Sequence, residues 1–453
     1  MKATKLIQRI MGVFVAAMIF TACEKGVHDN EYPLGDGEAA VFVGMESSKP
    51  VSCLSVFVFD DDGAQTQRKD YTDPRIPARE CLTVAAGSHT IVVVANVAAG
   101  NLLTGTKADS GTEKSSLNDL SIWLKEHEAN YAEMMTASIQ ETSATGDVER
   151  ICLTLKEGAN GINITDVKLR LSLPGQIMPA YTARSGANPS LRLVTEVFKK
   201  GTETCLLRRS QLCIQQPDNT FEASLMVIPG EYDLRLWTDW SHDGTTCDSY
   251  YNTNNLNAVI LHTEDYMAGE ETEGKDAYYA TTMANVSEED MQMDITMIRP
   301  FARYRLVATD VKEYLNLIEK GENLTPIEDL EMRVCYEGFF PSAFSVVTGK
   351  PNDALAGICY ISGMADAEGY DRNEARQIGG DFVLTSDEES FVSVTVTMID
   401  KRNENEVNSV SGVKIPYRRG ELTTVTGNFL TAGYSSGSVE IDTDWGEDIV
   451  IEF

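Results

Sequence analysis

Hydrophobic and polar positions alternate with a period of two along most of the chain. Clear examples are the runs at 51–59, 167–173, 291–297 and 392–398, which are separated by turns rich in Gly, Pro, Asn and Asp. A period of two places successive side chains on opposite faces of a strand, and many short strands broken by such turns are typical of β-sandwiches. The pattern therefore predicts an all-β protein built of tandem β-sandwiches.

Two segments have helical rather than strand spacing. Ser115 or Ser116 can cap a helix over 117–124 whose leucines share one face, and residues 311–319 can form about two helical turns. We therefore expect one or two short helices in an otherwise β-rich chain.

The chain contains an internal repeat. Residues 82–93 and 225–236 share one pattern of strand, glycine turn and strand, which predicts an up-and-over β-hairpin in each copy. Matching elements lie before and after it, and their preserved order predicts two related sandwiches. These flanking matches are 58–63 with 197–201, and 151–155 with 293–297.

These elements divide the chain into successive parts. We expect a signal peptide, a flexible tether and three sandwiches, with a linker rich in Gly, Pro, Ala and Ser between the first two sandwiches. The tether is expected because its residues are polar and acidic and have no apolar period. An alternative division has two domains, 39–187 and 190–453. The ranges of the first division are 1–22, 23–38, 39–187, 190–305 and 306–453.

The N-terminus has the pattern of an export signal. Basic residues precede an apolar stretch at 10–20, which is too short to cross a ~30 Å hydrocarbon core as a helix but long enough for a signal peptide. Small residues then lead into Cys23, a pattern that resembles the lipobox of bacterial lipoproteins. In those proteins the cysteine is lipidated, and two or three acyl chains hold a protein stably at a membrane. The alternative is a secreted protein cut after Ala22.

The charge of the chain excludes one class of partner. The formal net charge is −31 at pH 7. No basic stripe is available to release counterions from a phosphate backbone, so we do not expect nucleic acid as a partner.

The cysteines leave two interpretations open. Eight remain besides Cys23, which allows up to four disulfides, and none lies in a C-x-x-C pair typical of redox or zinc sites. Cys205 and Cys213 could face each other across a hairpin. Buried free thiols are the alternative.

No group of residues predicts catalysis. The five histidines lack the H-x-x-x-H spacing of a metal site, and the acidic turn at 60–63 lacks the glutamate that an EF-hand requires at loop position 12. Residues 433–437 match the nucleophile elbow G-x-S-x-G, but a strand pattern follows where that elbow needs a helix. We therefore expect a non-enzymatic protein without a metal or other cofactor.

Four aromatic residues are candidate glycan contacts: Trp237, Trp240, Tyr250 and Tyr251. Aromatic rings can stack on a sugar face while neighbouring carboxylates bind its hydroxyl groups. However, Trp237 and Trp240 have opposite parity, so they cannot point the same way in one regular strand. Packing in the core and in a loop is the alternative.

Three sets of segments resemble the fimbrillin-related surface lipoproteins of Bacteroidales bacteria. The second and third sets lie within 190–453 and are similar to a family domain of unassigned function, whereas the first is similar to the same group more loosely. The sets are 54–60 with 85–96; 228–240 with 250–253; and 299–304 with 336–344 and 415–429.

The resemblance implies transthyretin-like or immunoglobulin-like sandwiches exported as lipoproteins. Some members of the group polymerise into fimbriae after a trypsin-like protease cuts behind an arginine or lysine and frees a groove, which a strand of a neighbouring subunit then fills. Others keep their lipid and act as anchors or accessory subunits.

The positions of the basic residues favour the second role. Between Cys23 and the first strands lie only Lys25 and Lys49, and the first arginine after them is Arg68, beyond the strand at 51–59. We therefore expect a lipid-anchored outer-membrane protein at the cell surface, which acts as an anchor or accessory subunit of a fimbria-like adhesive structure. Other fimbrial subunits would be its partners, by strand addition at a sheet edge. The alternative is a surface glycan-binding lipoprotein that assists polysaccharide uptake.

Overall fold

The computed structural model confirms an all-β fold of tandem sandwiches. Cys23 and the segment 433–437 lie outside the residues that the structure describes. Those residues are 34–72, 78–102, 116–146, 148–174, 190–203, 205–241, 244–263, 275–322, 324–367, 369–432, 439–442 and 449–452.

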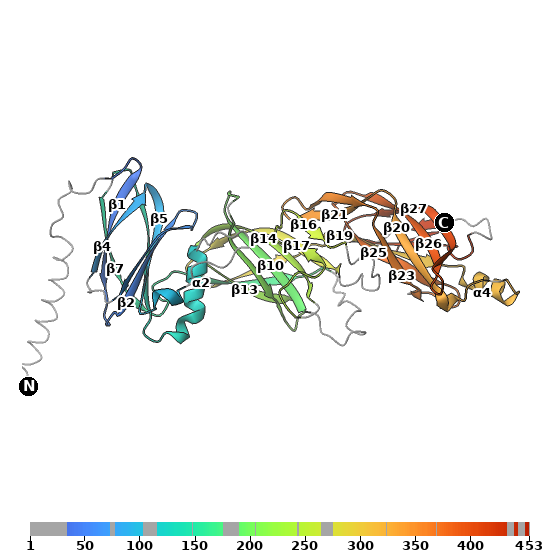
Figure 1. Cartoon of the computed structure of the whole chain (residues 1–453), viewed down its shortest axis with the longest axis horizontal. Helices are drawn as coiled ribbons and strands as arrows, with labels where there is room; N and C mark the ends of the chain where they lie inside the picture. The colour runs from blue at the N-terminus through green and yellow to red at the C-terminus, as the bar shows by residue number, and fades with distance from the viewer. Residues whose placement is uncertain are drawn as a thin grey trace, which may run out of the picture.

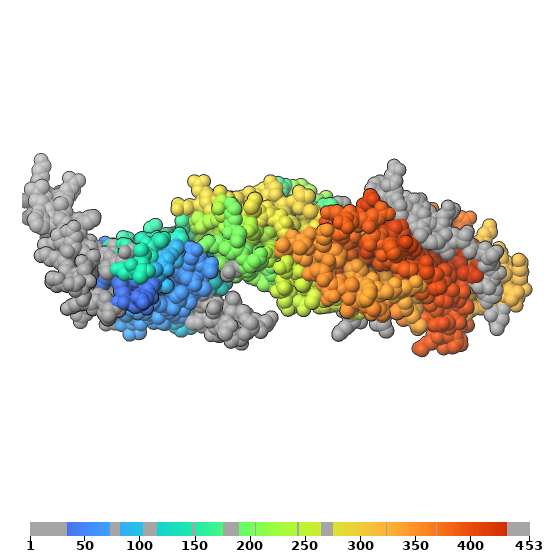
Figure 2. All heavy atoms as spheres, turned by 90° about the horizontal axis from the view of Figure 1, so that it is seen from above, coloured from blue at the N-terminus to red at the C-terminus, as the bar shows by residue number. Residues whose placement is uncertain are grey.

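Three sandwiches follow one another along the long axis of the molecule (Figures 1 and 2). The first pairs the sheet β4-β1-β7 with the sheet β3-β2-β5-β6-β8. Its strands are β1 (Glu38–Glu46), β2 (Cys53–Asp60), β3 (Gln65–Thr72), β4 (Ala78–Ala85), β5 (Gly87–Ala95), β6 (Met135–Ser143), β7 (Val148–Thr154) and β8 (Lys156–Glu157).

The second sandwich pairs the sheet β12-β13-β9-β18 with the sheet β11-β10-β14-β17 around its own core. Its strands are β9 (Thr165–Ser172), β10 (Ser190–Lys199), β11 (Cys205–Leu212), β12 (Ile214–Gln215), β13 (Phe221–Val227), β14 (Gly230–Ser241), β17 (Ala277–Val286) and β18 (Met291–Thr296).

The third sandwich pairs the sheet β24-β25-β19-β28-β29-β30 with the sheet β23-β20-β26-β27. Its strands are β19 (Phe301–Ala308), β20 (Leu330–Tyr336), β23 (Cys359–Gly363), β24 (Ala365–Asp366), β25 (Arg376–Leu384), β26 (Ser390–Asp400), β27 (Asn405–Tyr417), β28 (Leu422–Gly427), β29 (Val439–Asp442) and β30 (Ile449–Glu452).

All three sandwiches have the same strand topology. In each, the opening strand (β1, β9 or β19) pairs antiparallel with one later strand (β4, β13 or β25) and parallel with another (β7, β18 or β28). The facing sheets also share one order, because β3-β2-β5-β6 corresponds to β11-β10-β14-β17 and to β23-β20-β26-β27. The repeat predicted for two copies therefore occurs three times.

The predicted hairpin within the repeat is wrong. β4 and β5 follow one another across Gly87, yet β4 pairs with β1 and β5 pairs with β2 in the opposite sheet. β13 and β14 cross between sheets in the same way. Gly87 has a φ of 134°, a value that glycine adopts readily because it has no Cβ. The glycine turn is an arch between two sheets, and local sequence patterns do not distinguish an arch from a hairpin.

The first predicted domain boundary also needs correction. β9 falls within the expected first domain, 39–187, but it pairs with β13 and β18 of the second sandwich. Its Val167, Leu169 and Leu171 are buried in the second core. We therefore propose three units in which the second begins before Thr165.

Both predicted helices are present. Ser116 caps α2 (Leu117–His127), because its hydroxyl accepts a hydrogen bond from the Asp119 amide at 3.0 Å. Leu120 and Leu124 of α2 are buried with Phe57 and Val92 of the first sandwich in a satellite core. α4 spans Val311–Glu319. Of the described helices, none has the length and hydropathy of a transmembrane segment.

Candidate functional site

The second and third sandwiches are joined by a sheet to which both contribute. In the order of the chain, β15 and β16 come after β14 and before β17 of the second sandwich. Likewise, β21 and β22 come after β20 and before β23 of the third. The central pair is antiparallel, with Val259 opposite Phe344. The bounds are β15 (Tyr251–Asn252), β16 (Val259–Leu261), β21 (Phe339–Ser345) and β22 (Lys350–Ala356).

The hydrophobic core is continuous across this junction. Trp237 and Tyr279, from the second sandwich, belong to the same buried cluster as Phe344 and the core of the third. The Tyr279 and Phe344 rings meet edge to face, with their centroids 4.9 Å apart. Arg419 of the third sandwich donates to the Tyr279 hydroxyl at 2.8 Å. The last two sandwiches therefore share one continuous core, whereas the first two meet through partly buried side chains such as Ile122 of α2 and Ile228.

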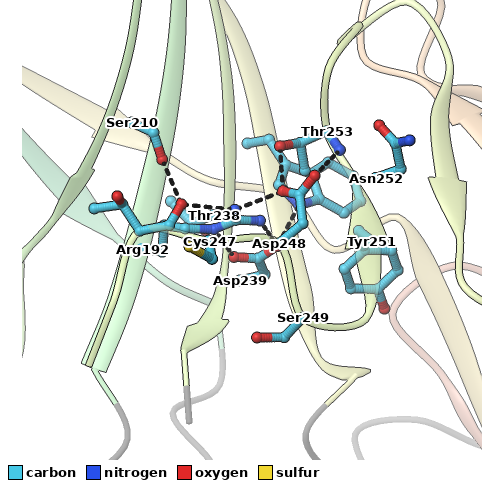
Figure 3. Close-up of polar contacts among 12 residues, drawn as sticks. Arg192, Ser210, Thr238, Asp239, Cys247, Asp248, Ser249, Tyr251, Asn252 and Thr253 are labelled. Carbon is cyan, nitrogen blue, oxygen red and sulfur yellow. Dashed lines mark hydrogen bonds and ion pairs between the residues drawn. The ribbon is translucent and has the colours of Figure 1, made fainter. Parts of the chain in front are cut away.

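A buried charged cluster supports the strands of the junction (Figure 3). The Arg192 side chain of β10 is 2% exposed and donates two hydrogen bonds to Asp239 of β14, at 2.7 and 2.6 Å. It donates a third to Asp248, at 2.6 Å, in the loop that leads to β15. Trp237 also donates to Asp239, at 3.2 Å. This cluster ties two strands and one loop together, and we call it the Arg192 cluster.

Asp248 connects the Arg192 cluster to the chain around β15. It accepts hydrogen bonds from the Thr253 amide at 3.0 Å and from the Thr253 hydroxyl at 2.7 Å. A second ion pair, Arg208 with Glu196, holds the chain just after β15, since Arg208 also donates to the Thr253 carbonyl. The chain on both sides of β15 is thus fixed by charged groups of β10 and β11.

The electrostatics of the Arg192 cluster depend on burial and on pairing. Burial alone would lower the pKa of Arg192, but its bonds to Asp239 and Asp248 outweigh burial and raise that pKa. Burial raises the pKa of Asp239, against the hydrogen bond from Arg192. Burial also acts to raise the pKa of Asp248, but hydrogen bonds from Thr253 and Arg192 lower it below 3.8 overall. The stability that Asp248 contributes is therefore present above that pH and lost as the pH falls through its folded-state pKa.

Only a weak signal in the sequence marks this cluster. Arg192 and Asp239 are charged residues within strand runs that contain large apolar side chains, at Leu191–Val194 and Trp237–Trp240. A charge within a buried strand requires a partner, but the sequence does not say which of the many carboxylates provides it.

The aromatic glycan candidates lie inside the protein. Trp237 and Tyr251 are fully buried and Trp240 is 4% exposed, while Tyr250 is partly buried against the shared core. As their parity predicts, Trp237 and Trp240 face different cores. A buried ring presents no face to a sugar, so in the described structure Trp237, Trp240 and Tyr251 offer no stacking platform.

Of the two interpretations left open for Cys205 and Cys213, the structure has the free thiols. Cys205 begins β11 and Cys213 follows its end, so one extended strand separates them. At about 3.3 Å per residue that distance far exceeds the reach of a disulfide. Burial raises the pKa of Cys213 to about 12, which keeps its thiol protonated. Among the described residues, no group of three or more His, Cys, Asp or Glu is arranged to hold a metal ion.

A disulfide that the sequence did not reveal joins Cys335 to Cys359, directly opposite one another in β20 and β23. The two residues are 24 positions apart. We expect the double change Cys335→Ser and Cys359→Ser to lower the free energy of unfolding by about 3 kcal/mol, because the closed loop restricts the unfolded chain. Urea denaturation measures this loss. The exposed Cys247→Ser is the control, and equal stability of the two variants would contradict the prediction.

The fold and the junction define a non-globular row of three sandwiches whose last two form one packed unit. The chain belongs to a family of unknown function, DUF6562, whose model matches residues 159–453. The matched region begins just before β9, and it contains both sandwiches of the packed unit together with the Arg192 cluster.

No curated protein matches the sequence. Among solved structures, the fimbrial anchor protein Mfa2 of Porphyromonas gingivalis is 11% identical with a TM-score of 0.33, covering 64% of this chain and 100% of its own. The tip fimbrial protein Mfa3 of the same organism is 11% identical with a TM-score of 0.32, at 62% and 100% coverage. A Bacteroides thetaiotaomicron protein, provisionally described as polysaccharide-binding, is 11% identical with a TM-score of 0.36, at 62% and 96% coverage. With scores this low, function has to be argued from the chain itself.

Proposed function

We propose that the protein is a non-catalytic, lipid-anchored surface protein that serves as an anchor or accessory subunit of a fimbria-like adhesive structure. The observation that carries the proposal is the serial arrangement of three sandwiches of one topology (Figure 1), which follow a sequence that resembles a lipobox. A lipid on Cys23 would hold the first sandwich near the outer membrane, and the packed second and third sandwiches would extend away from it. The disulfide supports export, because such bonds persist in oxidising compartments.

An edge strand is the surface that we propose for the partner subunit. β27 is the outermost strand of the sheet β23-β20-β26-β27 in the third sandwich, and it is thirteen residues long. Its outer edge carries backbone N–H and C=O groups that an added strand can pair with. Most of its residues between Asn405 and Gly412 are exposed or half-buried.

The surroundings of Arg68 favour a chain that is not cut there. Arg68 lies in β3, opposite Phe57 of β2. Its guanidinium donates to the Ala99 carbonyl at 2.6 Å and to Asp70 at 3.0 Å, and its side chain is 13% exposed. A protease would have to open this sheet edge before it could bind the bond after Arg68.

Lys49 is the more accessible basic residue. It lies in the connection between β1 and β2, and its side chain is 43% exposed. A cut behind it would release β1, which lies between β4 and β7, and would open a groove between those two strands. The anchor role therefore requires the chain to remain intact at Lys49.

Mass spectrometry of the N-terminus of the native protein, extracted from its own membrane, tests the proposal. We expect a triacylated Cys23 peptide on a chain that continues through Lys49. The variant Cys23→Ala should leave the membrane fraction, while Cys247→Ser should stay in it. A mature chain that starts after Lys49 or Arg68 and is found in sheared filaments would contradict the anchor role and indicate a polymerising subunit.

A further inference from the structure

A buried lysine–carboxylate pair lies where the second and third sandwiches meet. Lys275 lies two residues before β17 of the second sandwich, and Asp381 belongs to β25 of the third. The Lys275 Nζ is 3.3 Å from the Asp381 Oδ1, and the two side chains are 9% and 0% exposed. The other lysine–carboxylate pairs of the described residues involve side chains that are 36% or more exposed. Lys275 is therefore unusual in having its amine held against a fully buried carboxyl group.

Hydrogen-bond donors surround both oxygens of this carboxyl group. The Tyr336 hydroxyl donates to Oδ2 at 2.9 Å, and the Phe382 amide donates to Oδ1 at 2.8 Å. Tyr336 is in turn hydrogen-bonded to the Tyr304 hydroxyl, at 2.9 Å, in the core of the third sandwich. The Tyr251 hydroxyl donates to the Lys275 carbonyl. Tyrosine side chains therefore lie around the pair, and hydrogen-bond donors polarise the carboxyl group of Asp381.

We propose that Lys275 and Asp381 condense into an intramolecular amide bond. Within the ion pair, the ammonium passes one proton to Oδ1, which gives a neutral amine and a neutral carboxylic acid. The Nζ lone pair then forms a bond to Cγ, and the Cγ–Oδ1 bond breaks. Oδ1 leaves as water with the proton that it already carries and a second proton from the nitrogen. An ammonium and a carboxylate become one amide and one water, so the step needs no oxidant, reductant or cofactor.

The site provides what this reaction needs. Reacting atoms must approach within about 3–3.5 Å, and a rotation of the flexible lysine side chain carries Nζ from its contact with Oδ1 to Cγ. The Tyr336 hydroxyl is placed to stabilise the negative charge that develops on Oδ2 in the tetrahedral intermediate. Water, which would hydrolyse the product, is excluded by the burial of both groups. The amide also removes two charges whose desolvation is costly in a protein interior.

The bond would link the packed unit covalently. The two residues are 106 positions apart and belong to different sandwiches, so a force that pulls the sandwiches apart would act on an amide bond as well as on sheet hydrogen bonds. This inference goes beyond the proposed function and does not depend on it.

Peptide mapping of the mature, unfolded protein after trypsin digestion tests the inference. An amide at Lys275 blocks cleavage there, and Arg299 is followed by proline, so the bond would yield residues 236–303 joined to residues 377–401. The mass of this species would be lower than the sum of its parts by one water molecule. Free peptides 236–275 and 276–303, recovered in full from the wild-type protein, would overturn the proposal and leave an ion pair only.

Two variants distinguish loss of the amide bond from loss of the folded structure. Lys275→Arg keeps a positive charge opposite Asp381 but has no nucleophilic amine, so it should fold, lose the joined peptide entirely and melt at a lower temperature. Tyr336→Phe keeps the ring but removes the donor to Oδ2, so the joined fraction should form several-fold more slowly after refolding. If Lys275→Arg gave the same mass deficit as the wild type, the assignment to Lys275 would be overturned.

Discussion

Replacing Arg192 with methionine is expected to lower the free energy of unfolding by about 3–5 kcal/mol, because removal of one partner leaves the others as uncompensated buried charges. Asp239 would keep its burial and lose both hydrogen bonds from the guanidinium, and Asp248 would lose one. Methionine has nearly the same volume, so the loss would come from charge and hydrogen bonding rather than from a cavity.

Chemical denaturation of the mature protein measures this loss, with Arg170→Met as the matched control. Arg170 forms an ion pair with Asp218 in which both side chains are about a third or more exposed, so its replacement should cost less than about 1 kcal/mol. Arg192→Lys should fall between the two, because an ammonium keeps the charge but not the paired geometry. Similar losses for Arg192→Met and Arg170→Met would mean that the cluster does not stabilise the junction.

The fold class could be predicted from the sequence because strand periodicity is a local property. Alternation along runs such as 167–173 and 291–297 follows directly from which face of a strand is buried, and both runs are strands of the second core. The opposite parity of Trp237 and Trp240 likewise determined that they face different cores. The order of the repeated elements also follows from short local patterns, and this order identified the related sandwiches.

What the sequence could not supply was the choice of partners between distant segments. Leu82 and Ile91 look like two arms of a hairpin, but each pairs with a strand encoded earlier in the chain. Arg192 meets Asp239 and Asp248 only because β10, β14 and the following loop converge. Among 69 acidic residues, nothing local marks these two. Pairings of this kind depend on topology and appear only once the sheets are assembled.

The junction explains why one family model spans two sandwiches. A strand pair contributed by both, the continuous core and the Arg192 cluster make 159–453 a single packing unit. In the anchor or accessory role proposed above, this unit would resist a force that pulls its two sandwiches apart. The first and second sandwiches have separate main cores, and they meet through the partly buried Ile122 of α2 and Ile228.

Trp237→Ala is expected to be the most damaging change in the hydrophobic part of the junction, with a loss of about 3–5 kcal/mol in the free energy of unfolding. The indole is fully buried, and its ring centroid lies 5.2 Å from that of Tyr251 and 6.3 Å from that of Phe344. Its removal leaves a cavity between the two sandwiches and deprives Asp239 of the indole hydrogen bond. Hydrogen exchange should therefore accelerate first at β16 and β21.

Phe339→Ala is the control for this experiment, because Phe339 lies in β21 of the same junction sheet but is 79% exposed. Its replacement should change stability by no more than about 0.5 kcal/mol. Polysaccharide binding measured on both variants separates packing from recognition. If Trp237→Ala left stability and hydrogen exchange unchanged but abolished binding to a polysaccharide, the ring would have to be reachable by a sugar in solution. That outcome would replace the packing role of Trp237 with the glycan role that its sequence context first indicated.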